Sequence, residues 1–383
     1  MLTWLIARHL GIEAYGLYVI LWSFVLLLGS IQTPFIINPM LTLGSKAVNK
    51  DKEHFFSSYF YFQFAFSLFS VVAMYIIYFA AKLLNIEYSF IVFTGTVLYG
   101  ISYNYYEFCR RYLLTVSSGA KILISDTLTQ VSLLLVVFIA WYNKILSLEL
   151  FLYASFFVYL VSTLLILWEI KLPSVKRNFL VVRFKNNLKY STPMMRLSVS
   201  QFFSGHYFIY IAVYLLGQNI AGVVGVLRNV FAPLVVGLMA LDNSMPQQSM
   251  RAHEDRGSNL SHYMRISFLK WLLLFIAFSV AVVIFGDYIV VRLYGQEYMD
   301  YAGYLSWFAA THILMLGVRV LAIYARTINR MKVFTVQALV TLLFTLISTY
   351  PLIHFLGLNG AFAVMTGQQL LMIFVLLKNL NKQ

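Results

Sequence analysis

The chain has 383 residues, of which 61% are hydrophobic and only 11% are charged, against roughly 25% charged residues in soluble domains. This composition excludes an ordinary soluble enzyme and indicates a protein that crosses a membrane several times. The net charge of +14 falls almost entirely between apolar segments, so we expect no nucleic-acid partner. A single cysteine, Cys109, excludes a disulfide framework and a multi-cysteine metal site.

The hydropathy pattern predicts an all-α integral membrane protein. Its first stretch, Met1–Leu10, is apolar but too short to cross about 30 Å of hydrocarbon. No cleavable signal peptide is readable there, because a basic start and a small-residue cleavage site are both missing. Eleven longer spans follow, near residues 15–44, 55–81, 89–109, 122–142, 150–170, 188–216, 220–246, 264–286, 302–325, 333–355 and 360–377.

Lysine and arginine are distributed unequally between alternate loops. One set of loops and the C-terminal tail carry twenty of them, and the other set carries four. The positive-inside rule places the first set, and therefore the C-terminus, in the cytoplasm. The longest basic loop, 171–187, would also attract anionic lipid headgroups. We expect an N-terminal lobe at 1–170, a linker at 171–187 and a C-terminal lobe at 188–383.

Weak internal similarity supports two related lobes. Matching positions, offset by 206 or 207 residues, are Leu10-Gly11 with Leu216-Gly217, Gly16 with Gly222, and Pro39 with Pro246 at helix ends. The alternative interpretation is that glycine and proline simply end helices everywhere. If the repeat is real, the first residues correspond to the end of the helix bearing Arg196, and most of the first helix is missing.

Three arginines, Arg196, Arg228 and Arg319, lie inside predicted spans. A charge in hydrocarbon costs several kcal/mol on most scales, so each needs a polar cavity, an anionic partner or an ion pair. Arg228 lies nine residues from the nearer surface, about 14 Å deep at about 1.5 Å per residue. Two polar stripes at helical spacing point to a shared groove: Arg196, Ser200, Ser204 and Tyr207, and Arg228, Ala232, Val235, Met239 and Asp242.

Other polar residues allow several interpretations. Tyr103, Tyr106 and Tyr207 could contact the apolar faces of sugars, although tyrosines also favour membrane interfaces. Asp242 could couple transport to a proton or cation, or could pair with a nearby cation. Glu107 precedes two arginines at the spacing of helix-surface salt bridges.

No metal site, cofactor, nucleotide-binding loop or catalytic triad is expected, because His206, His312 and His354 lie on separate spans and no GxxxxGK[ST] loop occurs.

Three short motifs lie at predicted extracytoplasmic turns along the whole chain, as Ala7–Gly11 with Tyr15–Tyr18, Tyr294–Tyr298 and Gly357–Ala361. Together they resemble the polysaccharide flippases of the O-antigen and teichoic-acid type (Wzx-like) within the multidrug/oligosaccharidyl-lipid/polysaccharide (MOP) exporter superfamily. The resemblance implies two six-helix lobes, about twelve segments with the first incomplete, and a central cavity of alternating access. This chain departs from the family at its N-terminus, where members carry a complete first helix.

The resemblance also implies a cargo and its binding residues. The cargo would be an undecaprenyl-diphosphate-linked oligosaccharide, flipped across a bacterial cytoplasmic membrane for O-antigen, capsule or exopolysaccharide synthesis. Arg196, Arg228 and Arg319 would then bind the diphosphate, and the three tyrosines would contact sugar. Other partners would be membrane lipids, a polysaccharide polymerase and a chain-length regulator, with the chain itself a monomer.

Three alternatives remain open. A lipid II flippase has closely similar chemistry, whereas a cation-coupled drug exporter should line its cavity with carboxylates. A membrane glycosyltransferase or polymerase should carry charged catalytic groups on large outer loops, but the predicted outer loops are short, with acidic residues clustered only in Asp287–Asp300.

The charge asymmetry yields a topology test. Reporter fusions within 171–187 should show cytoplasmic activity, and fusions at Gln218 should show the opposite location, because basic loops stay on the cytoplasmic side. Paired alkaline-phosphatase and fluorescent-protein fusions measure this directly. Extracytoplasmic activity from the basic loop would contradict the topology.

Overall fold

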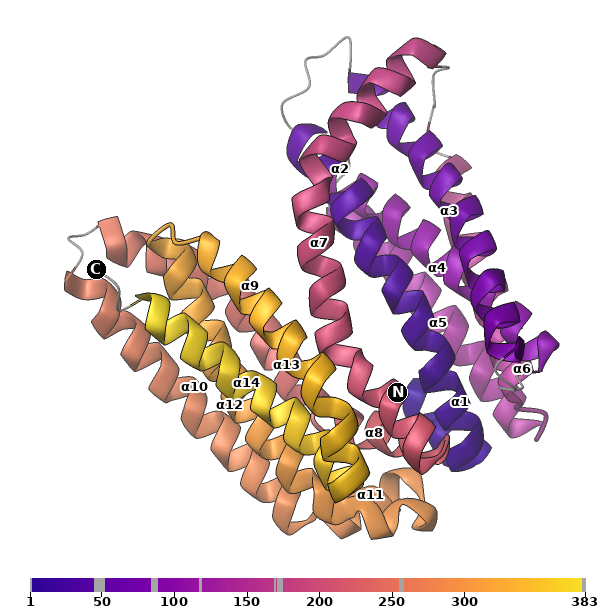
Figure 1. Ribbon diagram of the computed structural model, residues 1–383. Helices are drawn as coiled ribbons and strands as arrows, with labels where there is room; N and C mark the ends of the chain where they lie inside the picture. The colour runs from indigo at the N-terminus through magenta and orange to yellow at the C-terminus, as the bar shows by residue number, and fades with distance from the viewer. Residues whose placement is uncertain are drawn as a thin grey trace. The chain divides into compact units, whose positions relative to one another are not determined.

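The computed structural model describes residues 2–44, 52–83, 89–116, 119–168, 170, 175–254 and 258–380, and these are helical apart from short turns (Figure 1). This confirms the predicted all-α class. The elements are α1 (Leu2–Gln32), π-helical η1 (Thr33–Ile37), α2 (Asn38–Gly44), α3 (Lys52–Leu83), α4 (Phe90–Val116), α5 (Gly119–Tyr142), α6 (Leu148–Trp168), α7 (Arg177–Leu216), α8 (Asn219–Val230), α9 (Ala232–Glu254), α10 (Ser258–Ile284), α11 (Gly286–Tyr294), 3₁₀-helical η2 (Gln296–Tyr304), α12 (Leu305–Thr327), α13 (Lys332–Leu356) and α14 (Leu358–Leu380).

Within the described residues, nine helices are long and apolar enough to cross a membrane, or ten if the bent pair α8 and α9 forms one span. Eleven spans were expected. The remaining one, near 89–109, is present as the 27-residue helix α4 but is less apolar. Its second half carries Asn104, Glu107, Arg110 and Arg111, and these polar side chains are used inside the protein, as described below.

The chain forms two compact units. The C-terminal unit comprises Thr3–Val19 and Ser200–Gln383, and the N-terminal unit comprises Ile20–Val199. Both divisions fall inside helices, α1 and α7, rather than in the basic stretch 171–187. From Arg177 onward that stretch is the start of α7 and not a loop, whereas 171–174 lie outside the described residues. The lobe boundaries at 170 and 188 therefore stay a prediction.

The first residues of the chain pack into the C-terminal unit. Gly11 interrupts α1 with φ 81° and ψ 170°, a conformation that glycine adopts without steric cost. Before this kink, the Trp4 indole donates a hydrogen bond to the Leu293 carbonyl and the Arg8 guanidinium donates to the Arg292 carbonyl. The short apolar stretch at the start of the chain therefore continues across the Gly11 kink into the first long helix, and its side chains bind to the backbone of α11.

Two glycines at matching repeat positions, Gly16 and Gly222, make a reciprocal helix crossing. A Cβ added at Gly16 would lie 2.6 Å from the Gln218 carbonyl oxygen, and one added at Gly222 would lie 2.6 Å from the Ile12 carbonyl oxygen. Ile12 and Gln218 are themselves 206 residues apart, as are the two glycines. This symmetric contact between α1 and α8 supports the internal repeat, and only residues without a side chain allow such close backbones.

The predicted span 220–246 is wrong as a single helix. α8 and α9 meet at Phe231 with a bend of 58°. Pro233 lies in the first turn of α9, where its ring opposes the carbonyl of residue 229 and removes one helical hydrogen bond. Of the repeat prolines, Pro39 lies in the first turn of α2, whereas Pro246 lies inside α9 rather than at a helix end.

The N-terminal unit is built around α4, which packs along α6. Tyr99 and Tyr159 stack at 5.7 Å between ring centroids. On the α5 side, the Arg110 guanidinium donates to both Asp126 carboxylate oxygens, at 2.8 and 2.9 Å, and the Tyr106 hydroxyl donates to the same carboxylate at 2.8 Å. The Arg110 side chain in the polar half of α4 therefore has its counter-ion, Asp126, within the same unit.

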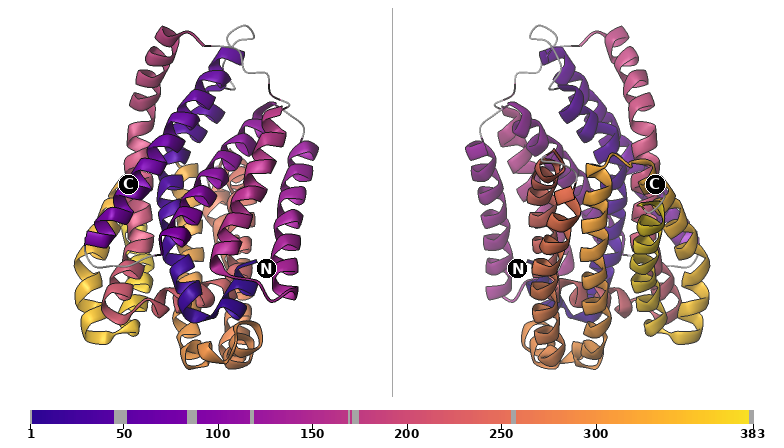
Figure 2. Two further views of the ribbon diagram at one scale, coloured as in Figure 1. Left: turned by 90° about the vertical axis from the view of Figure 1, so that its right-hand side faces the viewer. Right: turned by 90° about the vertical axis from the view of Figure 1, so that its left-hand side faces the viewer.

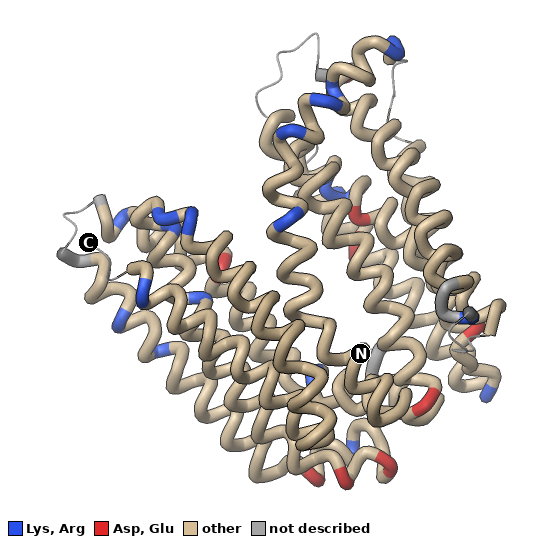
Figure 3. The backbone as a smooth tube through the Cα atoms, viewed as in Figure 1, with Lys and Arg blue, Asp and Glu red and all other residues tan. Residues whose placement is uncertain are grey.

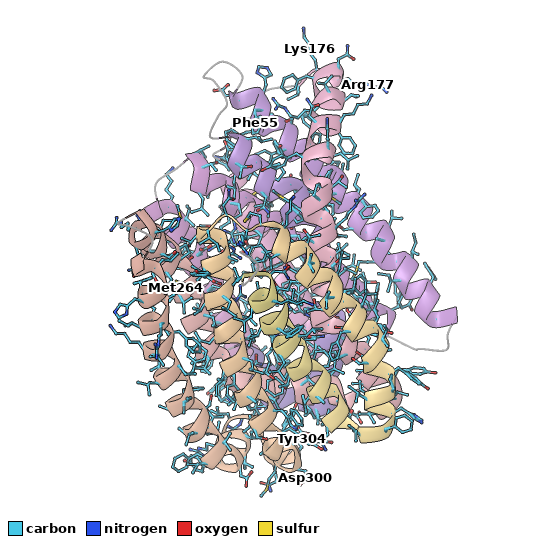
Figure 4. All side chains as sticks on the ribbon, turned by 60° about the vertical axis from the view of Figure 1, so that its left-hand side comes forward. Phe55, Lys176, Arg177, Met264, Asp300 and Tyr304 are labelled. Carbon is cyan, nitrogen blue, oxygen red and sulfur yellow. The ribbon has the colours of Figure 1, made fainter. Side chains whose placement is uncertain are left out.

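In the C-terminal unit, α10 and α14 pack on α12, and α13 packs on α14 (Figures 1 and 2). Most lysines and arginines of this unit gather at the end where the C-terminus lies, and most acidic residues gather at the other end (Figure 3). In Figure 4, Met264 lies toward the end rich in lysine and arginine, and Asp300 and Tyr304 lie toward the acidic end. This polarity agrees with the loop charges that the sequence analysis used for orientation.

The glycine crossing can be tested by adding single methyl groups. Gly16→Ala and Gly222→Ala should each lower the melting temperature by several degrees, because overpacking costs about 1–3 kcal/mol. The double variant should lose less than the sum, since one displacement of the helices relieves both contacts. Gly303→Ala is the control, because a Cβ there meets no atom within 4 Å. Equal melting of all four variants would refute the close crossing.

Candidate functional site

A cavity of about 520 Å³ lies within the C-terminal unit, bounded by α7, α8, α9, α12, α13 and α14. Three of its lining residues are arginines and two are histidines, and no carboxylate is among the described residues that line it. The full lining is Gln201, Ser204, Gly205, His206, Phe208, Arg228, Val235, Phe308, Thr311, His312, Met315, Val318, Arg319, Ala322, Arg326, Phe334, Gln337, Met365, Gln368, Gln369 and Met372. We call it the arginine cavity.

The longest polar stripe in the arginine cavity belongs to α12. His312, Arg319 and Arg326 follow one another at seven-residue steps and all line the cavity, so they fall on one helix face. Fourteen residues correspond to about 21 Å at about 1.5 Å per residue, which is most of the apolar thickness of about 30 Å. At the basic end of this stripe, the Arg326 guanidinium lies 5.4 Å from the centre of the Phe334 ring.

Arg228 reaches the cavity from the last turn of α8. Backbone carbonyls at a helix C-terminus carry partial negative charge, which favours a cation there. The bend at Phe231 therefore places Arg228 at a helix end rather than in mid-helix. The next residue, Asn229, donates a 2.9 Å hydrogen bond to the buried Tyr15 hydroxyl, so the residues at the bend are held against α1.

Arg319 is paired. Its guanidinium lies 3.2 Å from the Asp242 carboxylate on α9, and the two side chains are 44% and 28% exposed. A pair this accessible contributes about 0.2–1 kcal/mol to stability. The Asp242 carboxylate also offsets positive charge of Arg319, so Arg228 and Arg326 contribute more to the net charge of the cavity.

The α7 wall is shifted from the predicted stripe. Gln201, Ser204, Gly205 and Phe208 line the cavity, while neither Arg196 nor Tyr207 is among the lining residues. The buried Gln368 amide fixes this wall, donating to the Ser204 carbonyl at 2.5 Å and to the Thr345 hydroxyl at 2.6 Å. This amide therefore ties α14 to both α7 and α13.

Arg196 lies in the N-terminal unit, and its side chain is exposed. Arg196 and Ser204 share a helical face, but the arginine cavity begins at Gln201, about one turn beyond Arg196 along α7. Its role in diphosphate binding stays a prediction.

Comparison with known proteins gives structural neighbours only. No protein-family model matches the chain, and no curated protein matches it significantly. Among solved structures, it is similar to an inward-facing multidrug-resistance MATE transporter of the MOP superfamily, with a TM-score of 0.74 and 15% identity over 98% of this chain and 92% of the other. The lipid II flippase MurJ, in an inward closed conformation, gives a TM-score of 0.71 and 13% identity over 99% and 84%. A third, a MOP-superfamily transporter from Pyrococcus furiosus, gives 0.54 and 14% over 96% and 85%.

The chain has the fold of the MOP-superfamily transporters. This confirms the fold class expected from the motifs, while the polysaccharide-flippase subfamily stays a prediction. The neighbouring structures are a transporter and a flippase.

The MOP fold separates the three tyrosines proposed as sugar contacts. Tyr106 is buried and donates to Asp126, so its hydroxyl has a structural partner. Tyr103 lines a second cavity, in the N-terminal unit, and lies edge-on to Trp22 at 5.1 Å between ring centroids. Tyr207 is partly buried beside the α7 wall. Of the three, Tyr103 has the surroundings best suited to a ligand.

Several lining residues were not proposed from the sequence. His206 and His312 were considered only as metal ligands, and among the described residues no group of three potential metal ligands occurs. Each histidine is held by a hydrogen bond between Nδ1 and the carbonyl four residues earlier, at 3.2 and 2.8 Å. The seven-residue steps from His312 to Arg326 are visible in the sequence and could have shown that these polar residues share one helix face. The adjacent glutamines Gln368 and Gln369 within an apolar segment were a second such signal.

The Arg319–Asp242 pair allows two roles for Asp242 to be separated. If Asp242 is only a counter-ion, Asp242→Asn should release Arg319 and strengthen the binding of inorganic pyrophosphate severalfold, because the net charge of the site rises by one. If Asp242 couples transport to a cation, the same variant should lose transport. Calorimetric titration with pyrophosphate, beside a transport assay, measures both. Weaker pyrophosphate binding in Asp242→Asn would contradict the counter-ion role.

Proposed function

We propose that this chain flips an undecaprenyl-diphosphate-linked oligosaccharide across a bacterial cytoplasmic membrane by alternating access, for the synthesis of a surface polysaccharide. The supporting observation is the arginine cavity, which presents three guanidinium groups and two histidines, with no carboxylate among the described residues of its lining. Such a wall suits an anionic ligand. The diphosphate is the part of this cargo that carries negative charge.

The physical problem of flipping is the charge of the diphosphate. An anion in a low-dielectric region loses its hydration, and the cost falls when fixed positive charge replaces the lost water. Guanidinium presents several donors in a plane and can bind two phosphate oxygens at once. Arg228 and the α12 stripe would offer such donors at successive depths, so the phosphates could be passed along without being released into hydrocarbon.

Cavity polarity also distinguishes the competing transport functions. A carrier for cationic drugs should present carboxylates, whereas no carboxylate is among the described residues that line this cavity, and Asp242, the partner of Arg319, does not line it. For the Pyrococcus furiosus transporter of this fold, reverse polarity of the binding pocket suggests a different function. A lipid II flippase would need the same diphosphate chemistry, so the arginine cavity supports it equally well and only the cargo sugars separate the two.

The remaining features of the proposal follow from the sequence. The chain would lie in the cytoplasmic membrane as a monomer with its C-terminus in the cytoplasm, since the basic loops favour that side. Its product would pass to a polysaccharide polymerase and a chain-length regulator. Arg196, Arg228 and Arg319 remain the proposed diphosphate ligands, with Arg228 the principal one and Arg326 added from the cavity lining.

Arg228 provides the direct test. Arg228→Glu should abolish surface polysaccharide, Arg228→Lys should keep part of it, and Arg228→Ala should fall between, because lysine keeps the charge but loses the bidentate geometry. Immunoblots of surface polysaccharide, divided by the amount of folded protein in the membrane, measure export per molecule.

Arg292→Glu is the matched control, since Arg292 is an exposed arginine on α11 and does not line the cavity. It should export normally. If export in the Arg228 series falls only in proportion to protein abundance, Arg228 is a structural residue and the proposed function loses its main support.

A further inference from the structure

A second cavity, of about 400 Å³, lies within the N-terminal unit between α4 and the segment that joins α1 to α2. Seven of its lining residues are polar, namely Gln32, Thr33, Asn38, Tyr103, Asn104, Glu107 and Arg111. Its volume lies at the lower end of the range of about 300–1,000 Å³ typical of small-molecule sites. We call it the amide cavity.

One wall of the amide cavity is a π-helical turn. The segment η1 (Thr33–Ile37) widens the helix by one residue per turn, with Pro34 at its start. Such widened turns are uncommon and occur frequently at functional sites. The Gln32 amide fixes this turn against the rest of the unit, because its Nε2 donates to the Gln63 side chain at 2.9 Å and to the Asn104 carbonyl at 2.7 Å.

Asn104, on the opposite wall, has an unused donor. The residue is only 4% exposed, and its Nδ2 has no hydrogen-bond partner among the described residues. A buried amide without a partner destabilises a protein, so its presence on a cavity wall favours a ligand that accepts a hydrogen bond there. Tyr103, the preceding residue, adds an aromatic ring to the same wall.

The charge of the amide cavity differs from that of the arginine cavity. Its two charged lining residues, Glu107 and Arg111, form an ion pair at 3.6 Å, and Glu107 also contacts Arg110 at 3.5 Å. The Glu107 carboxylate is therefore already neutralised by two arginines, which disfavours a cation as the ligand. An anion is disfavoured too, since the positive charge is balanced. The wall suits an uncharged molecule with many hydroxyl or amide groups.

We propose that the amide cavity binds one or two uncharged sugar rings of the cargo, with Asn104 donating to a sugar oxygen and Tyr103 covering an apolar ring face. Amides, a paired carboxylate and an aromatic ring together match the alternating hydroxyls and C–H faces of a sugar. This inference rests on the proposed function for the identity of the cargo.

The test uses the full chain in lipid nanodiscs and two kinds of soluble probe. Lactose, maltose and N,N′-diacetylchitobiose represent neutral sugars, and inorganic pyrophosphate represents the diphosphate. Saturation-transfer NMR should detect saturable binding of at least one disaccharide. Asn104→Leu should weaken that binding about three- to tenfold, the loss expected for one hydrogen bond, and should leave pyrophosphate binding unchanged.

Asn187→Leu is the matched control. Asn187 is also buried in the N-terminal unit, at 1% exposure, but its amide is satisfied, accepting from the Tyr59 hydroxyl at 3.0 Å and donating to the Phe35 carbonyl at 2.6 Å. Because the Asn187 amide donates to Phe35 in η1, Asn187→Leu should lower the melting temperature, and any loss of sugar affinity in it should accompany that loss of stability. Asn104→Leu should lose affinity while keeping or raising the melting temperature.

Each outcome supports or overturns the binding of sugar in the amide cavity. The sugar site is overturned if no disaccharide saturates, if Asn104→Leu binds normally, or if it melts as early as Asn187→Leu, which would make Asn104 structural. Pyrophosphate binding that Arg228→Ala does not weaken counts against the diphosphate role of the arginine cavity alone. Disaccharide binding that depends on Asn104 would support the sugar site even then.

Discussion

The cost of placing a guanidinium away from water is the constraint that governs the C-terminal unit. Arg228 can be kept in the apolar part of the chain because it ends a helix, faces a cavity and is surrounded by polar side chains of α7, α12 and α14. Without the bend at Phe231 it would lie in mid-helix, where carbonyl groups are already used. The bend, the cavity and the charge therefore depend on one another, and Pro233 is the covalent feature that fixes the bend.

Close backbone contact is the second requirement. The Gly16–Gly222 crossing brings α8 against the start of the chain, and the Tyr15 hydroxyl accepts the Asn229 amide one residue beyond Arg228. In hydrocarbon, apolar burial gives little net attraction between helices, so close packing and hydrogen bonds take its place. The crossing is thus both a packing contact and the support on which the arginine cavity is built.

The two cavities, each within its own unit, differ in chemistry. One presents unbalanced positive charge, and the other presents amides, an aromatic ring and a neutralised carboxylate. A lipid-linked oligosaccharide has both kinds of group, whereas a hydrophobic cationic drug has neither in this combination. The fold, shared with drug exporters and with a lipid II flippase, does not select among cargoes, and the residues lining each cavity do so.

Sequence alone determined the membrane class, the position of most helices and the polarity of the loops, because hydropathy and charge are local properties that no packing can reverse. It also placed Arg228 and Arg319 within apolar spans and Gly11 and Gly217 at turns, and both glycines adopt positive φ. The break at Phe231 was missed because one proline among apolar residues hardly changes hydropathy.

Only the tertiary structure decided which polar residues meet. A helical face shows where a side chain points but not which helix it faces, so Arg196 was grouped with a cavity that begins a turn beyond it. The partner of Arg319 and the unused amide of Asn104 likewise depend on distances between helices far apart in the chain. Such distances follow from the packing of all neighbouring side chains together, which no local pattern encodes.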